Sequence, residues 1–112
     1  MIRVTVFCDS EHRYQGIDLC GHAGDALNPR EGQELVCAAV SALTLNMANS
    51  VEQFTEDPFQ ADEDETDGVF RFRFTSSISP ESELLINSLV SGLLDIEEEY
   101  GEPYIKIRFE EV

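Results

Sequence analysis

Residues 21–43 read GHAGDALNPREGQELVCAAVSAL, and within them the spacing of apolar side chains changes from that of a strand to that of a helix. From residue 36 onward apolar residues recur at three- and four-residue steps, as the buried stripe of a helix does: Val36, Val40, Leu43, Met47, Val51 and Phe54. Gly32 interrupts the polar segment before them, which predicts a short turn at 29–31 and a main helix that opens near Gly32. The stretch also holds His22 and Cys37, two residues that could act together in chemistry.

Two strands are expected before this stretch. Apolar residues alternate with polar ones from Ile2 to Val6, and a turn-like segment follows at 9–11. A second alternating run extends from residue 14 to residue 20, with Ile17 and Leu19 on one face. Because this run leads directly into Gly21, His22 is expected at a strand end, on the loop that leaves the sheet.

Another strand pattern follows the first helix. Asp67-Gly68 predicts a hairpin turn into a strand at 69–74, whose three phenylalanines at 70, 72 and 74 would face the core. Residues 60–64 could pair with it, although their alternation is weak. The surrounding acidic run is DEDETDG, and a charge run of this sort is most often a solvated edge.

The chain closes with a helix and a strand. Ser79-Pro80-Glu81 is a helix start, and the helix stops at Gly101 and Pro103. Its apolar stripe consists of Leu85, Leu89, Leu93 and Ile96, and the closing strand carries Ile105, Ile107 and Phe109 on one face. This order predicts an α+β fold with a small, mostly antiparallel sheet and two helices packed on one face. At 112 residues, one domain spanning 1–112 is the natural expectation.

Composition limits the kinds of function. The chain has 23 acidic residues against 7 basic ones, a net charge of −16, and no Lys or Arg from Glu31 to Phe70. Such a charge disfavours nucleic acid and favours a basic protein partner, although acidity also serves solubility alone. Three cysteines without CxxC spacing fit neither a disulfide framework nor a zinc ribbon. With no signal peptide pattern and no run of about 18 apolar residues, we expect a soluble, cytoplasmic protein without a membrane partner.

The strongest chemical hypothesis pairs a thiol with a base. Cysteine attacks as its thiolate, which a neighbouring imidazole or a helix N-terminus favours. The glycine-containing connection between His22 and Cys37 is long enough to fold the histidine back toward the thiol. Glu34, three residues before Cys37, could orient the imidazole as a third member.

Simpler interpretations compete with this one. A cysteine beside Ala-Ala-Val on a helix is more often packed than reactive, and a histidine between glycines is often only a turn residue. Cys20 is a rival thiol, whereas Cys8 and His12 could be plain hairpin residues. Cys20, His22 and Cys37 could also bind a metal, but their spacing matches no compact zinc motif. We therefore expect no metal and no cofactor.

The two motifs together resemble a known family. Gly21-His22-Ala23-Gly24, followed by GQELVCAAVSAL at 32–43, is similar to the signature of the ribosomal-processing cysteine protease family, Prp. That signature joins a GHA segment to G-x-D-I-V-C-A and a Ser-Ala-Leu continuation. The late segment DIEEEY at 95–100 is close to the family's I-E-E-E-Y ending, so the resemblance covers nearly the whole chain.

The resemblance implies an activity and roles for single residues. It implies that Cys37 is the nucleophile and His22 its base in a small homodimeric enzyme without a cofactor. The implied substrate is a basic ribosomal protein, the twenty-seventh of the large subunit's L series, whose N-terminal extension is removed after two phenylalanines and before a small residue. Glu34 stands where the family usually has Asp, Ser41 matches the family's serine, and the loop that contains Pro29 is longer than usual.

Two hypotheses from different classes follow. The first is a cysteine endopeptidase acting through Cys37 and His22, with Glu34 and Ser41 as auxiliary residues. The second is a non-enzymatic acidic adaptor that binds a basic ribosomal protein or assembly factor and merely packs Cys37 in its core. A metal-binding module is a third, weaker possibility.

Overall fold

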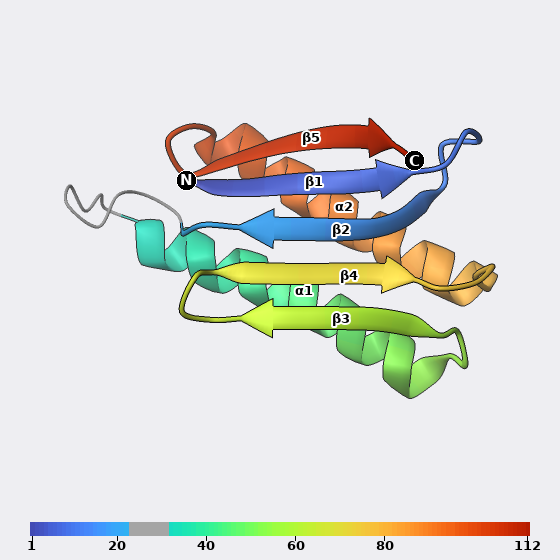
Figure 1. Cartoon of the computed structure of the whole chain (residues 1–112). Helices are drawn as coiled ribbons and strands as arrows, with labels where there is room; N and C mark the ends of the chain where they lie inside the picture. Colours follow the sequence, from blue (N-terminus) through green and yellow to red (C-terminus); the bar gives the residue numbers. More distant parts are fainter. Residues whose placement is uncertain (23–31) are drawn as a thin grey trace.

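The computed structural model describes residues 1–22 and 32–112, which form five strands and two helices (Figure 1). In chain order these are β1 (Ile2–Cys8), β2 (Tyr14–Cys20), α1 (Gln33–Phe54), β3 (Phe59–Asp64), β4 (Val69–Phe74), α2 (Pro80–Tyr100) and β5 (Ile105–Glu111). Every strand and helix expected from the sequence is present, including the weakly patterned β3. The predicted turn at 29–31 lies outside the described residues.

The five strands make one sheet in the order β3-β4-β2-β1-β5. β1 pairs with β2, β2 with β4, and β4 with β3, all antiparallel, while β5 lies parallel to β1 at the edge. Both helices cover the same face of the sheet, so its other face is open (Figure 1). The predicted α+β class, with a mostly antiparallel sheet and two helices on one face, is therefore confirmed.

The core lies between that sheet face and the helices. Every second side chain of β1, β2 and β4 points to this face, and α1 and α2 cover it with their apolar stripes. The residues that are buried include Ile2, Val4, Val6, Ile17, Leu19, Val36, Val40, Met47, Val51, Phe72, Ile86, Leu89, Leu93 and Ile105. Most of the expected stripe of α1 is confirmed.

For two residues of that stripe the prediction of burial is wrong. The side chain of Phe54 is 69% exposed and that of Leu43 is 38% exposed, whereas Thr44 and Ser50 are buried in α1. Phe54 is the last residue of the helix, where the sheet no longer covers it. Thr44 tolerates burial because its hydroxyl donates to the carbonyl of Val40, at 2.7 Å.

Helix α1 opens as the sequence indicates. Gly32 takes a left-handed conformation with φ of 88°, and its carbonyl accepts from the amide of Val36 at 3.0 Å. By length and composition alone α1 could cross a membrane, but its buried side chains belong to the core of the fold, as in core helices generally. Cys37, the fifth residue of α1, lies on the second turn of the helix, near the end of β2.

Candidate active site

A pocket of about 260 Å³ lies where the beginning of α1 meets the end of β2 and the start of β4. Its floor is apolar and consists of Ile2, Leu19, Val40, Leu45, Val69 and Phe70. Its polar lining comes from three separate segments: Gly21 and His22 after β2, Cys37, Ser41 and Thr44 on α1, and Glu63, Asp64, Glu65 and Gly68 around the β3–β4 turn. The pocket thus holds both residues of the predicted thiol–base pair.

Cys37 reaches this pocket from the second turn of α1. The residue is partly buried, packs against the core and carries a thiol rather than a disulfide. Ser41 lies one helical turn further along and also lines the pocket, as residues four apart on a helix do. The structure therefore places the predicted nucleophile and the predicted auxiliary serine on one face of α1.

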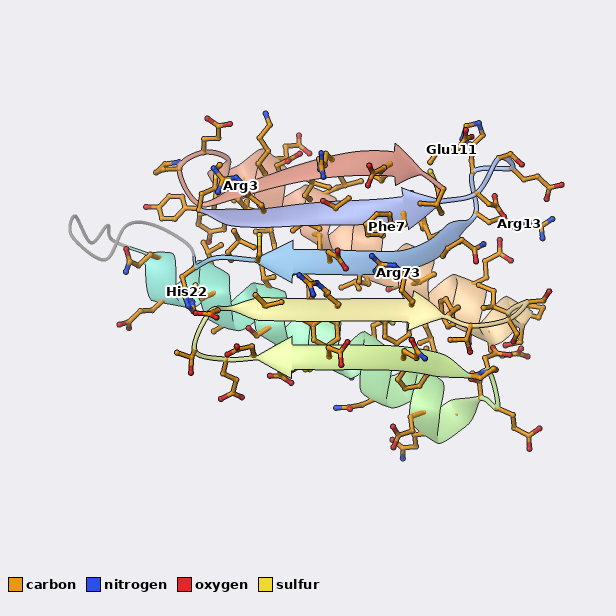
Figure 2. The ribbon with its side chains drawn as sticks, in the orientation of Figure 1. Arg3, Phe7, Arg13, His22, Arg73 and Glu111 are labelled. Atoms are coloured by element: carbon orange, nitrogen blue, oxygen red, sulfur yellow. The ribbon has the colours of Figure 1, made fainter. Side chains whose placement is uncertain are left out.

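His22 reaches the pocket from the opposite side. Gly21 turns the chain out of β2 with φ of 91°, and a Cβ at this position would lie 2.5 Å from the carbonyl oxygen of Met1. Only glycine allows the backbone to come this close to Met1, which explains why a glycine precedes His22. Figure 2 shows His22 at the end of the sheet, beside the first turns of α1.

The imidazole of His22 rests on the β3–β4 turn. A Cβ at Gly68 would lie 2.9 Å from both Cε1 and Nε2 of His22, and 2.6 Å from the carbonyl oxygen of Gly21. Gly68 itself has φ of 63°. Its lack of a side chain therefore leaves the space that the imidazole edge occupies.

Glu34 does not join this arrangement. It lies in the first turn of α1, is exposed to solvent and is not among the residues that line the pocket. An exposed carboxylate on that turn interacts favourably with the helix N-terminus, which gives it a role in the helix itself.

The competing thiols and histidine lie elsewhere. Cys20 is exposed and lines a hollow on the open face of the sheet, away from the pocket that holds Cys37. Cys8 is at the far end of β1, where its thiol donates to the carbonyl of Glu110 at 3.7 Å, and His12 lies in the β1–β2 turn. Among residues 1–22 and 32–112 no three His, Cys, Asp or Glu side chains converge on a possible metal position.

The acidic side of the pocket was not predicted. The sequence marks the run at 62–68 as a solvated edge, and its acidic residues are exposed, but Glu63, Asp64 and Glu65 also line the pocket beside His22. They do so because β4 pairs with β2, which brings the β3–β4 turn next to the end of β2. The Asp67-Gly68 pair predicts the turn itself. Which strand lies beside that turn depends on long-range strand pairing, which the local sequence does not show.

A thiol and an imidazole that line one pocket are the groups a cysteine peptidase uses. The family model described as cysteine protease Prp matches residues 1–106 of this chain. The chain therefore belongs to the Prp family, and it is a cysteine protease. The resemblance of its two motifs to that family is confirmed.

Relatives of known name support the same assignment. The chain is 32% identical over 104 residues to the ribosomal processing cysteine protease Prp of Bacillus subtilis, covering 89% of this chain and 90% of that protein. It is 28% identical over 102 residues to the protein of the same name from Staphylococcus aureus, covering 91% of this chain and 93% of that protein. The match thus spans nearly all of both sequences.

Solved structures agree with the fold. The crystal structure of Prp from S. aureus with a substrate peptide superimposes with a TM-score of 0.87 at 25% identity, covering 98% of this chain and all of that one. A second structure of that protease, with a covalently linked product peptide, gives 0.86 at 26% identity with 98% of this chain covered. SMU.848 from Streptococcus mutans gives 0.82 at 26% identity with all of this chain covered.

Proposed function

We propose that this chain is a cysteine endopeptidase in which Cys37 is the nucleophile and His22 its base. The observation that carries the proposal is that both residues, brought from two different elements, line one pocket in a member of the Prp family. Cys20 and His12, the chemically equivalent alternatives, lie outside that pocket. One protease domain would span residues 1–112.

The proposed reaction has two steps. The Cys37 thiol gives its proton to the His22 imidazole, and the sulfur attacks the carbonyl carbon of the scissile peptide bond. The imidazolium then gives that proton to the leaving amine, and a water molecule hydrolyses the acyl-enzyme. Backbone N–H groups near the beginning of α1 are suited to donate hydrogen bonds to the oxyanion. Ser41, on the same face as Cys37, is an auxiliary residue, whereas the exposure of Glu34 argues for a structural role.

The proposed substrate is a basic ribosomal protein with an N-terminal extension, the twenty-seventh of the large subunit's L series. The relatives' name, ribosomal processing protease, supports this choice. The pocket supports it as well, because an apolar floor suits the side chains beside the cut, and Glu63, Asp64 and Glu65 suit basic residues nearby. The non-enzymatic adaptor is set aside because the family is one of proteases.

The proposal includes a cellular setting. We place the enzyme in the cytoplasm, where ribosomal proteins are made, as a homodimer that binds neither nucleic acid nor membrane. A net charge of −16 supports a basic protein partner over a polyanion.

The central test is peptide cleavage by paired variants. A synthetic peptide with the extended ribosomal N-terminus, ending in Phe-Phe and a small residue, is incubated with the enzyme and analysed by mass spectrometry. We expect Cys37→Ala to abolish cleavage and His22→Ala to lower the rate by at least about 100-fold, since both groups act in the chemical step. Labelling of Cys37 by iodoacetamide should also slow in His22→Ala.

The chain supplies its own controls. Cys20→Ser and His12→Ala remove a thiol and an imidazole that lie outside the pocket, so both variants should cleave at the wild-type rate. Full activity in Cys37→Ala would disprove the assignment. A loss in Cys20→Ser equal to that in Cys37→Ala would do the same.

A further inference from the structure

Thr44 brings a polar group to the bottom of the active-site pocket. Within the described ranges 1–22 and 32–112 it is the one polar side chain among the buried residues of the lining, with an exposed fraction of 2%. The other buried residues of the lining are aliphatic: Ile2, Leu19 and Val40. Ser41, which carries the second hydroxyl of the lining, is an exposed residue. The hydroxyl of Thr44 therefore belongs to the apolar floor of the pocket rather than to its rim.

The hydroxyl of Thr44 is used as a donor but not as an acceptor. It donates to the carbonyl of Val40 at 2.7 Å. Because a hydroxyl has one proton and two lone pairs, this bond leaves the Thr44 oxygen able only to accept. In the part of the chain that the structure describes, no group donates to that oxygen. The floor of the pocket thus holds a hydrogen-bond acceptor whose lone pairs are open to a ligand.

Thr44 lies on the same side of α1 as the proposed nucleophile. Cys37, Ser41 and Thr44 follow one another at steps of four and three residues, so they form a row along one helix face. Seven residues of helix separate Cys37 from Thr44, which is about 10 Å along the axis. An extended aromatic side chain and one hydrogen bond together span such a distance. A substrate side chain that enters the pocket beside the thiol therefore has its far end near Thr44.

The side chain that fits this floor best is a phenol. Leu19, Val40 and Phe70 line the pocket with apolar surface, which suits an aromatic ring. Tyrosine carries a hydrogen-bond donor at the far end of its ring, where phenylalanine has only a C–H group. A lysine ammonium would instead lose its hydration among apolar residues without gaining a charged partner at the floor. The hydroxyl of a serine or threonine is too close to its own backbone to reach the floor.

We infer that Thr44 is a specificity-determining residue, which lets the pocket accept tyrosine as well as phenylalanine beside the cut. The inference rests on the proposed function in taking a pair of aromatic residues as the cleavage site. A pocket with a purely apolar floor would bury the phenol hydroxyl without a partner, which is unfavourable. With Thr44 in place, the phenol donates to the threonine oxygen while the threonine keeps its own bond to Val40. The substrates then include peptides with tyrosine at one of the two aromatic positions.

The test compares the Phe-Phe peptide with two peptides in which tyrosine replaces the first or the second phenylalanine. For the wild-type enzyme we expect kcat/KM of at least one tyrosine peptide to lie within about threefold of that of the Phe-Phe peptide. Thr44→Val exchanges the hydroxyl for a methyl group, so it should lower the tyrosine-to-phenylalanine ratio of kcat/KM at that position by at least about tenfold. Thr44→Ser keeps the hydroxyl and should keep the wild-type ratio. Ser41→Ala removes the exposed hydroxyl and should change the cleavage of both peptides alike.

A wild-type enzyme that disfavours tyrosine by more than about tenfold at both positions would overturn the inference. So would a ratio that Thr44→Val leaves at its wild-type value, or one that Ser41→Ala lowers equally. Thermal unfolding of each variant confirms that it folds.

A binding measurement separates this inference from the protease activity. Fluorescence anisotropy with labelled peptides gives the same ratio as dissociation constants for Cys37→Ala and for Cys37→Ala combined with Thr44→Val, without any cleavage. If the wild-type enzyme fails to cut the Phe-Phe peptide, that result counts against the protease, while the binding ratio still decides the role of Thr44. If none of the three peptides binds, the inference is overturned as well.

Discussion

Gly68 shows how a residue without a side chain takes part in the site. It lies in the β3–β4 turn, far from His22 in sequence, yet the imidazole edge occupies the space its Cβ would fill. Any other residue would have to displace the ring or the turn, because a separation of 2.9 Å from Cε1 and Nε2 is too short for a carbon contact. Gly68 is therefore a positioning residue for the proposed base.

Substitution of this glycine should impair catalysis more than folding. In Gly68→Ala the new methyl group would clash with the carbonyl oxygen of Gly21 and with the imidazole of His22, so the proposed base must move within the pocket, and displacements of about 1 Å lower rates by up to about 100-fold. We expect kcat to fall by about 10- to 100-fold. The left-handed backbone adds a stability loss of about 1–2 kcal/mol. Steady-state kinetics and thermal unfolding separate the two effects.

Gly101 provides the matched control. Its φ of 59° is close to that of Gly68, but a Cβ there would meet only the carbonyl oxygen of Glu97, at an ordinary 3.5 Å. Gly101→Ala should therefore lose stability through its backbone alone, since φ of 59° with ψ of −156° is a conformation that glycine favours, and it should keep its kcat. Equal losses of kcat in the two alanine variants would show that Gly68 has no role in placing His22.

The helices and strands themselves were largely predictable from sequence, whereas the pairing of the strands and the packing of the helices on them were not. Alternation in β1 and the cap at Ser79 are local signals, which each segment carries by itself. The pairing of β4 with β2 is not local, and it alone brings Glu63 and Gly68 to His22. The exposure of Phe54 has the same origin, because a helix stripe shows which side is apolar but not how far the sheet beneath it extends.

Asp57 connects the end of α1 to the beginning of α2. The amide of Ser79 donates to the Asp57 carboxylate at 3.0 Å, and the Ser79 hydroxyl donates to the same oxygen. The Ser79 oxygen in turn caps α2 by accepting from the amide of Ser82 at 3.3 Å. Hydrogen bonds from the Ser79 side chain, and then from Ser82 and the Ser79 backbone, lower the pKa of Asp57 from its ordinary value of 3.8.

This lowered pKa predicts a pH-dependent contribution to stability. The folded state holds the charged form, so the contribution is complete above pH 3.8 and is lost as the pH falls through the lower pKa of the folded state. Asp57→Asn should therefore lower Tm at pH 7 and lower it less at pH 3. Glu52→Gln, an exposed change on α1, should show no such pH-dependent difference. An equal loss of Tm at both pH values for Asp57→Asn would contradict this assignment.

The distribution of charge over the molecule links the pocket to its substrate. The pocket lies between α1 and the β3–β4 turn, and no basic residue of the described ranges 1–22 and 32–112 lines it apart from His22. Glu63, Asp64 and Glu65 give this described lining acidic side chains. A basic chain would be steered toward the thiol.

Steering of this kind should appear as a dependence on ionic strength. For a basic peptide substrate, kcat/KM should fall as salt rises, since the Debye length shrinks from about 30 Å at 0.01 M to about 8 Å at 0.15 M. The pair Glu63→Gln and Glu65→Gln should lower kcat/KM several-fold at low salt and flatten its salt dependence, mainly through KM. The pair Glu52→Gln and Glu56→Gln removes the same charge from exposed positions near the other end of α1 and should have a much smaller effect.

If both pairs reduce the salt dependence equally, net charge alone attracts the substrate and the acidic lining of the pocket has no special part. A peptide whose lysines are replaced by glutamine should be insensitive to salt with every variant, which separates steering from any effect of salt on the enzyme.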